Sequence, residues 1–93
     1  MTEKSPADRP LRLLPGLGPK SIVWLNEVGI TSEAELRAIG AVAAYRRLKH
    51  WNPRLVSRNA LWGLYAALNG THWTSIDAAT KQRLLAEAGE NPD

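Results

Sequence analysis

The chain has 93 residues, a hydrophobic fraction of 44% and a formal net charge of +3. This length favours one domain with a modest core, and the small positive charge favours an anionic partner only slightly. The sequence has no cysteine, which excludes disulfides, thiolate metal sites and thiol catalysis. No apolar run is long enough to cross a bilayer, and the polar N-terminal segment has no signal pattern. We therefore expect a cytoplasmic protein.

The apolar residues follow helical spacing throughout the chain, and no run alternates apolar and polar residues as a strand would. We therefore predict an all-α fold, a compact cluster of five or six short helices, over residues 8–89. The segments 1–7 and 90–93 are predicted to be flexible tails. We expect the four tryptophans to support the small core, because each ring buries a large area.

The N-terminal third of the chain predicts two helices joined by a sharp turn. Asp8 is placed to cap a short first helix, whose apolar side would be formed by leucines in 11–14. Pro19 is a suitable first residue for the second helix, since its missing N–H has no helical partner there. Gly29 fits the left-handed position that ends this helix, and Ile30 would then fold back on Leu25.

The middle of the chain predicts two further helices separated by a glycine. Ser32 and Glu35 have the spacing of a capping box, in which each side chain bonds the other residue's backbone N–H. Gly40 is expected to end this third helix. A fourth helix is expected over 41–49, with basic residues near its C-terminus, where cations complement the helix dipole.

The C-terminal part predicts the last two helices. Asn52 and Pro53 are suitable as N-cap and first residue of a fifth helix, which Gly70 would end. A final helix is expected from about Asp77 to Ala88, with Gly89 after it. The short connections imply that the helices cross one another closely.

Gly16 and Gly18 flank the predicted turn before the second helix. Glycines allow backbone N–H groups to approach a ligand, and the N-terminus of a helix attracts anions, so the turn could receive a phosphate. Lys20 would add a positive charge beside it. The same glycines also permit a sharp corner between two packed helices, with Lys20 in solvent. The residues alone leave both interpretations open.

A second group of basic residues could extend a positive surface from this turn. It consists of Arg46, Arg47, Lys49, Arg54 and Arg58. On the predicted fifth helix, Arg54 and Arg58 are one turn apart and share a face. Binding of phosphates by such a surface would weaken steeply with salt. The alternative is an ordinary solvated face.

The sequence offers no pattern for catalysis or metal binding. His50 and His72 have neither a partner at ligand spacing nor a nearby carboxylate pair. We expect His72 to bond to the backbone while its neighbour Trp73 packs between the last two helices. No phosphate-binding loop, nucleophile elbow or paired carboxylate is present. We therefore predict a protein that is not an enzyme and that has no cofactor, metal or small-molecule substrate.

Five segments share residues, order and spacing with a bacterial family: Leu14–Ser21, Gly29–Ile30, Leu36–Tyr45, Leu48–Lys49 and Gly70–Trp73. The first resembles a helix-hairpin-helix motif, a unit that many DNA repair and replication proteins use to grip duplex backbones. Together the segments, within 11–88, resemble the C-terminal domain of the TfoX/Sxy family, regulators of natural DNA uptake in bacteria. Full-length members also carry an N-terminal α+β domain, and the residues quoted match only the C-terminal part.

The resemblance implies a non-enzymatic domain that binds the phosphate backbone of duplex DNA weakly and without reading sequence, with a role in transcription or competence regulation. The alternative is a protein interaction or self-association module without nucleic-acid contact, anchored by Trp51 or Trp62. Neither interpretation involves a membrane. The residues predicted to contact DNA are Gly16, Gly18, Lys20, Arg46, Arg47, Arg54 and Arg58.

Overall fold

The structure is a computed structural model that describes residues 10–11, 14 and 17–90, apart from the side chain of Trp73. The described part contains four α-helices and a short 3-10 helix, and it contains no β-strand beyond one isolated bridge between Pro10 and Ser32. The all-α prediction is therefore confirmed. The elements are α1 (Pro19–Glu27), α2 (Glu33–Trp51), α3 (Arg58–Asn69), η2 (Trp73–Ser75) and α4 (Ala78–Glu87).

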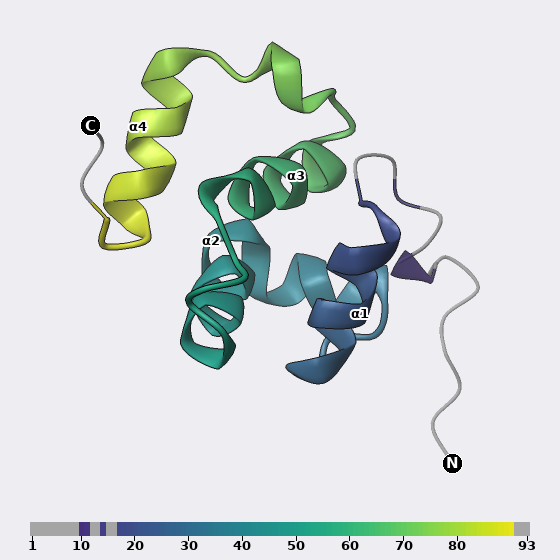
Figure 1. The fold of residues 1–93 in the computed structure, drawn as a ribbon. Helices are drawn as coiled ribbons and strands as arrows, with labels where there is room; N and C mark the ends of the chain where they lie inside the picture. Colours follow the sequence, from purple (N-terminus) through teal and green to yellow (C-terminus); the bar gives the residue numbers. More distant parts are fainter. Residues whose placement is uncertain (1–9, 12–13, 15–16, 91–93) are drawn as a thin grey trace.

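The helices form a small cluster around α2 (Figure 1). The contact between α2 and α3 is the most extensive between any two elements. α1 lies on the opposite side of the cluster from α4. From α3 the chain passes through η2 to α4. This arrangement leaves the outer surface of the second half of α2 uncovered by another helix.

Gly40 explains why the described residues form four α-helices and not the predicted five or six. Its backbone angles, φ +86° and ψ 164°, break the helical path inside α2. The predicted third and fourth helices are the two halves of this element, 33–39 and 41–51, and the glycine bends the chain between them. The predicted first helix falls mainly on residues outside the described ones.

Two helix ends agree with the pattern of glycines in the sequence. After α1, Gly29 has φ +86°, and the N–H of Ile30 donates to the carbonyl of Leu25 at 2.9 Å. After α3, Gly70 has φ +64°, and the N–H of Thr71 donates to the carbonyl of Ala66 at 3.0 Å. Both are the left-handed endings that glycine favours, and they satisfy carbonyls that the helix leaves free.

The start of α2 differs in one detail from the predicted capping box. The hydroxyl of Ser32 accepts the N–H of Glu35 at 3.3 Å, as predicted. The carboxylate of Glu35 reaches one residue further back, however, and accepts the N–H of Thr31 at 2.7 Å and its hydroxyl. The bond expected to the N–H of Ser32 is therefore replaced by two bonds to Thr31, whose hydroxyl offers a second donor.

The prediction that Asn52 and Pro53 open the next helix is wrong. Asn52 instead ends α2, with its N–H donating to the carbonyl of Leu48 at 2.9 Å, and a turn follows. The ammonium of Lys49 donates to the carbonyls of Val56 at 2.8 Å and Pro53 at 3.3 Å, which stabilises the turn. α3 begins only at Arg58, after Ser57 as N-cap.

The tryptophans do not all serve the core. Trp62 is only 8% exposed and belongs to the core, and the partly buried Trp24 packs against the core. Trp51 is 37% exposed at the end of α2, so the prediction that it supports the core is wrong. The largest side chains that are fully buried are Tyr45, Leu11, Leu25, Ile30, Leu36, Leu48, Leu61, Leu64 and Val56.

Candidate nucleic-acid interface

The second half of α2 presents a basic and aromatic stripe along one face. Positions three and four apart on a helix lie on the same side, so residues 43, 46, 47, 50 and 51 form a continuous row. We call this row the α2 stripe; its members, all exposed, are Ala43, Arg46, Arg47, His50 and Trp51. The opposite side of the same half-helix holds Tyr45 and Leu48 in the core.

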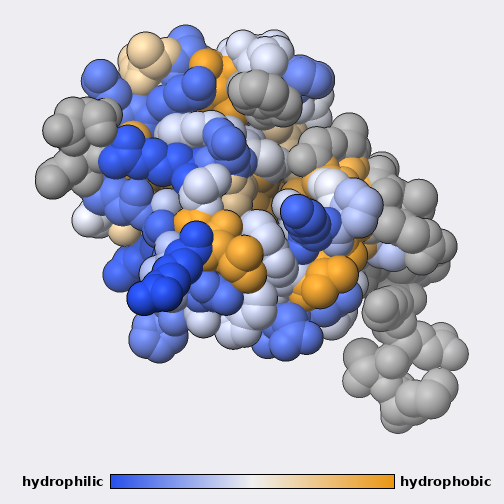
Figure 2. All heavy atoms as spheres, viewed as in Figure 1, coloured by the Kyte–Doolittle hydropathy of each residue, from blue (hydrophilic) through white to orange (hydrophobic). Residues whose placement is uncertain are grey.

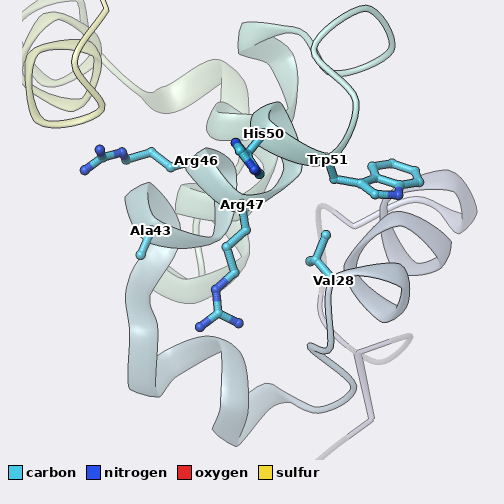
Figure 3. Close-up of a pocket in the computed structure, with 6 residues that line it drawn as sticks. All are labelled: Val28, Ala43, Arg46, Arg47, His50 and Trp51. Atoms are coloured by element: carbon cyan, nitrogen blue, oxygen red, sulfur yellow. The ribbon is translucent and has the colours of Figure 1, made fainter.

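The α2 stripe and Val28, which follows α1, line an open groove of about 650 Å³. We call it the α2 groove (Figure 3). In this view Arg47 extends between Ala43 and Val28, Trp51 lies on the side toward α1, and Arg46 points away from them. Its lining combines two aliphatic residues, Val28 and Ala43, with two arginines, a histidine and a tryptophan.

The two arginines of the groove differ in their surroundings from Arg37, Arg58 and Arg83, each of which lies beside a carboxylate. Among the described residues, no carboxylate forms an ion pair with Arg46 or Arg47, and no acidic residue lines the groove. Elsewhere Arg37 pairs with Glu33 at 2.6 Å, and Arg83 lies 3.7 Å from a carboxylate oxygen of Glu87. The groove therefore offers positive charge that no neighbouring carboxylate neutralises.

The face seen in Figure 2 is mostly hydrophilic, with small hydrophobic patches over α1 and over the turn after α2. Two aliphatic side chains of these elements are well exposed, Val23 by 57% and Leu55 by 54%. Val23 precedes Val28 by five residues and Leu55 follows Trp51 by four, so exposed apolar side chains are near in sequence to both segments that line the α2 groove.

The structure separates the predicted pair Arg54 and Arg58. Arg54 is exposed in the turn after α2, whereas Arg58 is the first residue of α3. The expectation that they share a helical face is wrong, because α3 begins five residues later than predicted, at Arg58 and not at Pro53. Arg58 is only half-exposed, and its Nε lies 3.5 Å from Glu90 Oε1.

Lys20 and Gly18 lie at the opposite end of α1 from the groove. Lys20 is exposed in the first turn, and Gly18 is the exposed N-cap. Lys20 and Val28 are eight residues apart, so a straight helix separates them by about 12 Å along its axis. Gly18 has φ −85° and open space around the position of a Cβ, so this backbone does not require glycine. Gly16 lies outside the described residues, and the helix-hairpin-helix element stays a prediction.

A hydrogen-bonded cluster joins the far side of the same half of α2 to the C-terminal end of the described chain. The hydroxyl of the fully buried Tyr45 donates to Glu90 Oε2 at 2.5 Å, and Glu90 also pairs with Arg58. Burial, followed by the bond and the negative charge of Glu90, raises the pKa of Tyr45 well above its ordinary value. Nothing local in the sequence indicates this contact, because it joins residues 45 apart.

The described histidines give no indication of metal chemistry. Among the described residues, no group of three or more histidine, aspartate or glutamate side chains has a geometry suited to a metal ion. Nδ1 of His72 accepts the N–H of Thr74 at 3.3 Å and lies 2.8 Å from its hydroxyl oxygen, so the predicted bond of this imidazole to the backbone is confirmed. The expected packing of Trp73 concerns a side chain outside the described ones. In the part of the chain described, no helix is both long and apolar enough to span a bilayer.

Comparison with known proteins identifies the domain. The family model described as the TfoX C-terminal domain matches residues 7–88. DNA transformation protein TfoX1 of Aliivibrio fischeri is 29% identical over 85 residues, which cover 91% of this chain and 41% of that protein. This chain therefore spans less than half the length of that relative.

A solved structure shares the fold. The crystal structure of an uncharacterized protein from Listeria monocytogenes aligns with a TM-score of 0.77 and 27% sequence identity, covering 88% of this chain and 97% of that one. The match to the family model covers most of the chain, and the resemblance noted in the sequence is confirmed. The chain belongs to the TfoX C-terminal domain family.

Proposed function

We propose that this domain is a non-enzymatic regulatory module that binds the phosphate backbone of DNA weakly and without sequence preference. Membership in the TfoX C-terminal domain family supports a regulatory role, and the A. fischeri relative is named for DNA transformation. The proposal for this chain rests on its own surface. The observation that carries it is the pair Arg46 and Arg47 on an exposed face of α2, neither of which forms an ion pair with a carboxylate of the described residues.

Arginine suits this role because its planar guanidinium donates two parallel hydrogen bonds to phosphate oxygens and stays charged at any physiological pH. Arg54 is exposed in the turn after the α2 stripe, and Lys20 is exposed at the far end of α1. Both could contact further phosphates, together with the backbone N–H groups around Gly16 and Gly18. Arg58 contributes least, because Glu90 already offsets part of its charge.

Few phosphate contacts are available, so the affinity should be modest, micromolar or weaker at physiological salt. The test is fluorescence anisotropy of a labelled duplex titrated with the chain at about 50 and 200 mM salt. We expect binding at low salt that weakens several-fold at high salt. The double variant Arg46→Glu/Arg47→Glu should abolish binding, because it reverses the charge at the α2 groove.

The matched control is Arg83→Glu, which reverses one exposed charge on α4 away from the groove. It should reduce affinity at most slightly through the change in net charge. Absence of binding at low salt, or equal loss in Arg83→Glu and in the double variant, would contradict the proposal.

Protein interaction or self-association is the second candidate function. The observation that favours it is the exposure of Val23, Trp51 and Leu55, three large apolar side chains. Trp62, the other anchor considered, is buried and cannot serve. Sedimentation velocity at several concentrations tests self-association: a sedimentation coefficient that rises with concentration supports it, and a monomer at every concentration contradicts it.

A further inference from the structure

We propose that the α2 groove receives an unpaired base of a single-stranded nucleic acid, stacked on the ring of Trp51, so that the domain binds single strands more tightly than duplex. This inference rests on the proposed function, since it assigns the phosphate contacts to the same groove. It adds a preference that backbone contacts alone would not produce.

Trp51 is the first part of the argument. It is the last residue of α2 and is 37% exposed, while Trp62 one helix away is almost fully buried. The ring forms part of the groove wall on the side toward α1, near Val28 (Figure 3). An exposed indole offers a flat surface on which any base can stack, because every base has a π-face.

The arginines are the second part. Arg47 precedes Trp51 by four residues and Arg46 by five, so the charges and the ring come from adjacent turns of one helix. A base on Trp51 would direct a phosphate toward Arg47, whereas Arg46 points away from the ring and would meet a phosphate further along the strand. A positive groove that follows the backbone, combined with an aromatic platform, is the arrangement that binds single-stranded nucleic acid without sequence preference.

The size and lining of the groove fit a single nucleotide unit. Its volume of about 650 Å³ is within the range of sites that hold small ligands. The aliphatic wall formed by Val28 and Ala43 suits the apolar face of a base, and none of the described residues that line the groove carries a carboxylate to repel a phosphate.

An unpaired base is required because each base inside a duplex is already stacked on both faces by its neighbours. The ring of Trp51 could reach such a base only after it had left the stack, which costs free energy. An acidic peptide is the other partner that positive charge beside an apolar wall would suit. An acidic peptide would need an apolar side chain at position 51 but not an aromatic ring. Substitutions of Trp51 can therefore distinguish a peptide from a single-stranded nucleic acid.

The experiment compares labelled oligothymidylate of about 15 nucleotides with the matching duplex, by anisotropy, for the whole chain and its variants. We expect tighter binding of the single strand. Trp51→Ala and Trp51→Leu should each weaken single-strand binding about 5- to 100-fold and change duplex binding by less than about twofold. Trp51→Phe, which keeps an aromatic ring, should retain most of the single-strand affinity.

Leu55→Ala is the matched control. It also removes an exposed apolar side chain, four residues after Trp51, but Leu55 does not line the groove. It should leave both affinities unchanged. Circular dichroism of every variant establishes that the helices remain, so that a loss of binding reports on the groove.

The outcomes separate the two proposals. If neither oligonucleotide binds at low salt, the proposed function itself is wrong. If both bind equally, or if Trp51→Leu binds the single strand as well as Trp51→Phe does, backbone binding stands and the stacking inference is overturned. Binding of an acidic peptide that survives Trp51→Leu, without single-strand binding, would also overturn it.

Discussion

Tyr45 contributes both to the hydrophobic core and to a hydrogen bond between distant parts of the chain. Its ring is fully buried in the core, while its hydroxyl bonds to Glu90 and thereby holds the end of α4 against α2. The sequence predicts a helix over 41–49, which includes Tyr45. It does not reveal Glu90 as the partner, because the predicted flexible tail begins at that residue and the contact depends on how α4 returns to the core.

The buried hydroxyl makes a prediction about stability. Tyr45→Phe removes the bond to Glu90 with little change of volume, and we expect it to lower the free energy of unfolding by about 1 kcal/mol at neutral pH. Urea denaturation followed by circular dichroism measures this change. A variant as stable as the natural sequence would show that the bond contributes nothing to folding.

The same side chain predicts a dependence on alkaline pH. The folded-state pKa of Tyr45 is raised above its ordinary value of 10.0, so above pH 10 the unfolded chain loses this proton while the folded chain keeps it. The stability of the natural chain should therefore fall as the pH rises above 10. Tyr45→Phe should show a smaller fall over the same range, and equal slopes would contradict this account.

At the scale of elements, the sequence predicts the starts of α1, α2 and α4 and the helix ends marked by glycine, but not the start of α3. The endings at Gly29 and Gly70 and the bend at Gly40 are predictable, because a positive φ is a local requirement that glycine meets. The start of α3 was misplaced because Asn52 and Pro53 suit the start of a helix but also suit the end of one. The hydrogen bonds from Lys49 to the turn favour a helix end at Asn52, and they are not apparent from the sequence.

Gly40 sets the direction of the half-helix that carries the α2 stripe, which makes it the element-scale position to test. Its φ of +86° strains any residue with a side chain, although no atom lies within 4 Å of the added Cβ. We expect Gly40→Ala to lower the free energy of unfolding by about 1 to 2 kcal/mol, measured by urea denaturation.

Gly18→Ala is the matched control for Gly40→Ala. Its φ of −85° suits any residue and the space around it is also open, so it should cost little or slightly stabilise the chain. Equal effects of the two substitutions would mean that the bend in α2 does not depend on the glycine conformation.

At the scale of the whole molecule, helical spacing predicts the all-α fold and the resemblance of five segments indicates the family, while the candidate site is only partly predictable from the sequence. The sequence named Arg46 and Arg47 but grouped them with Arg58, which the fold places beside Glu90. From the sequence, Trp51 is a candidate anchor for a protein partner, but nothing places it beside the two arginines. The α2 groove arises only when Val28, after α1, comes next to α2, and no local pattern encodes that packing.

The central claim is that the α2 groove is the surface at which this domain meets nucleic acid. The most direct test is to follow the amide and indole NMR signals of ¹⁵N-labelled chain as oligothymidylate is added at low salt. We predict that the largest shifts fall on 43–51, on Val28 and on the indole N–H of Trp51, with smaller ones near Lys20. Shifts confined to η2 and α4, or no shifts at saturating oligonucleotide, would contradict the claim.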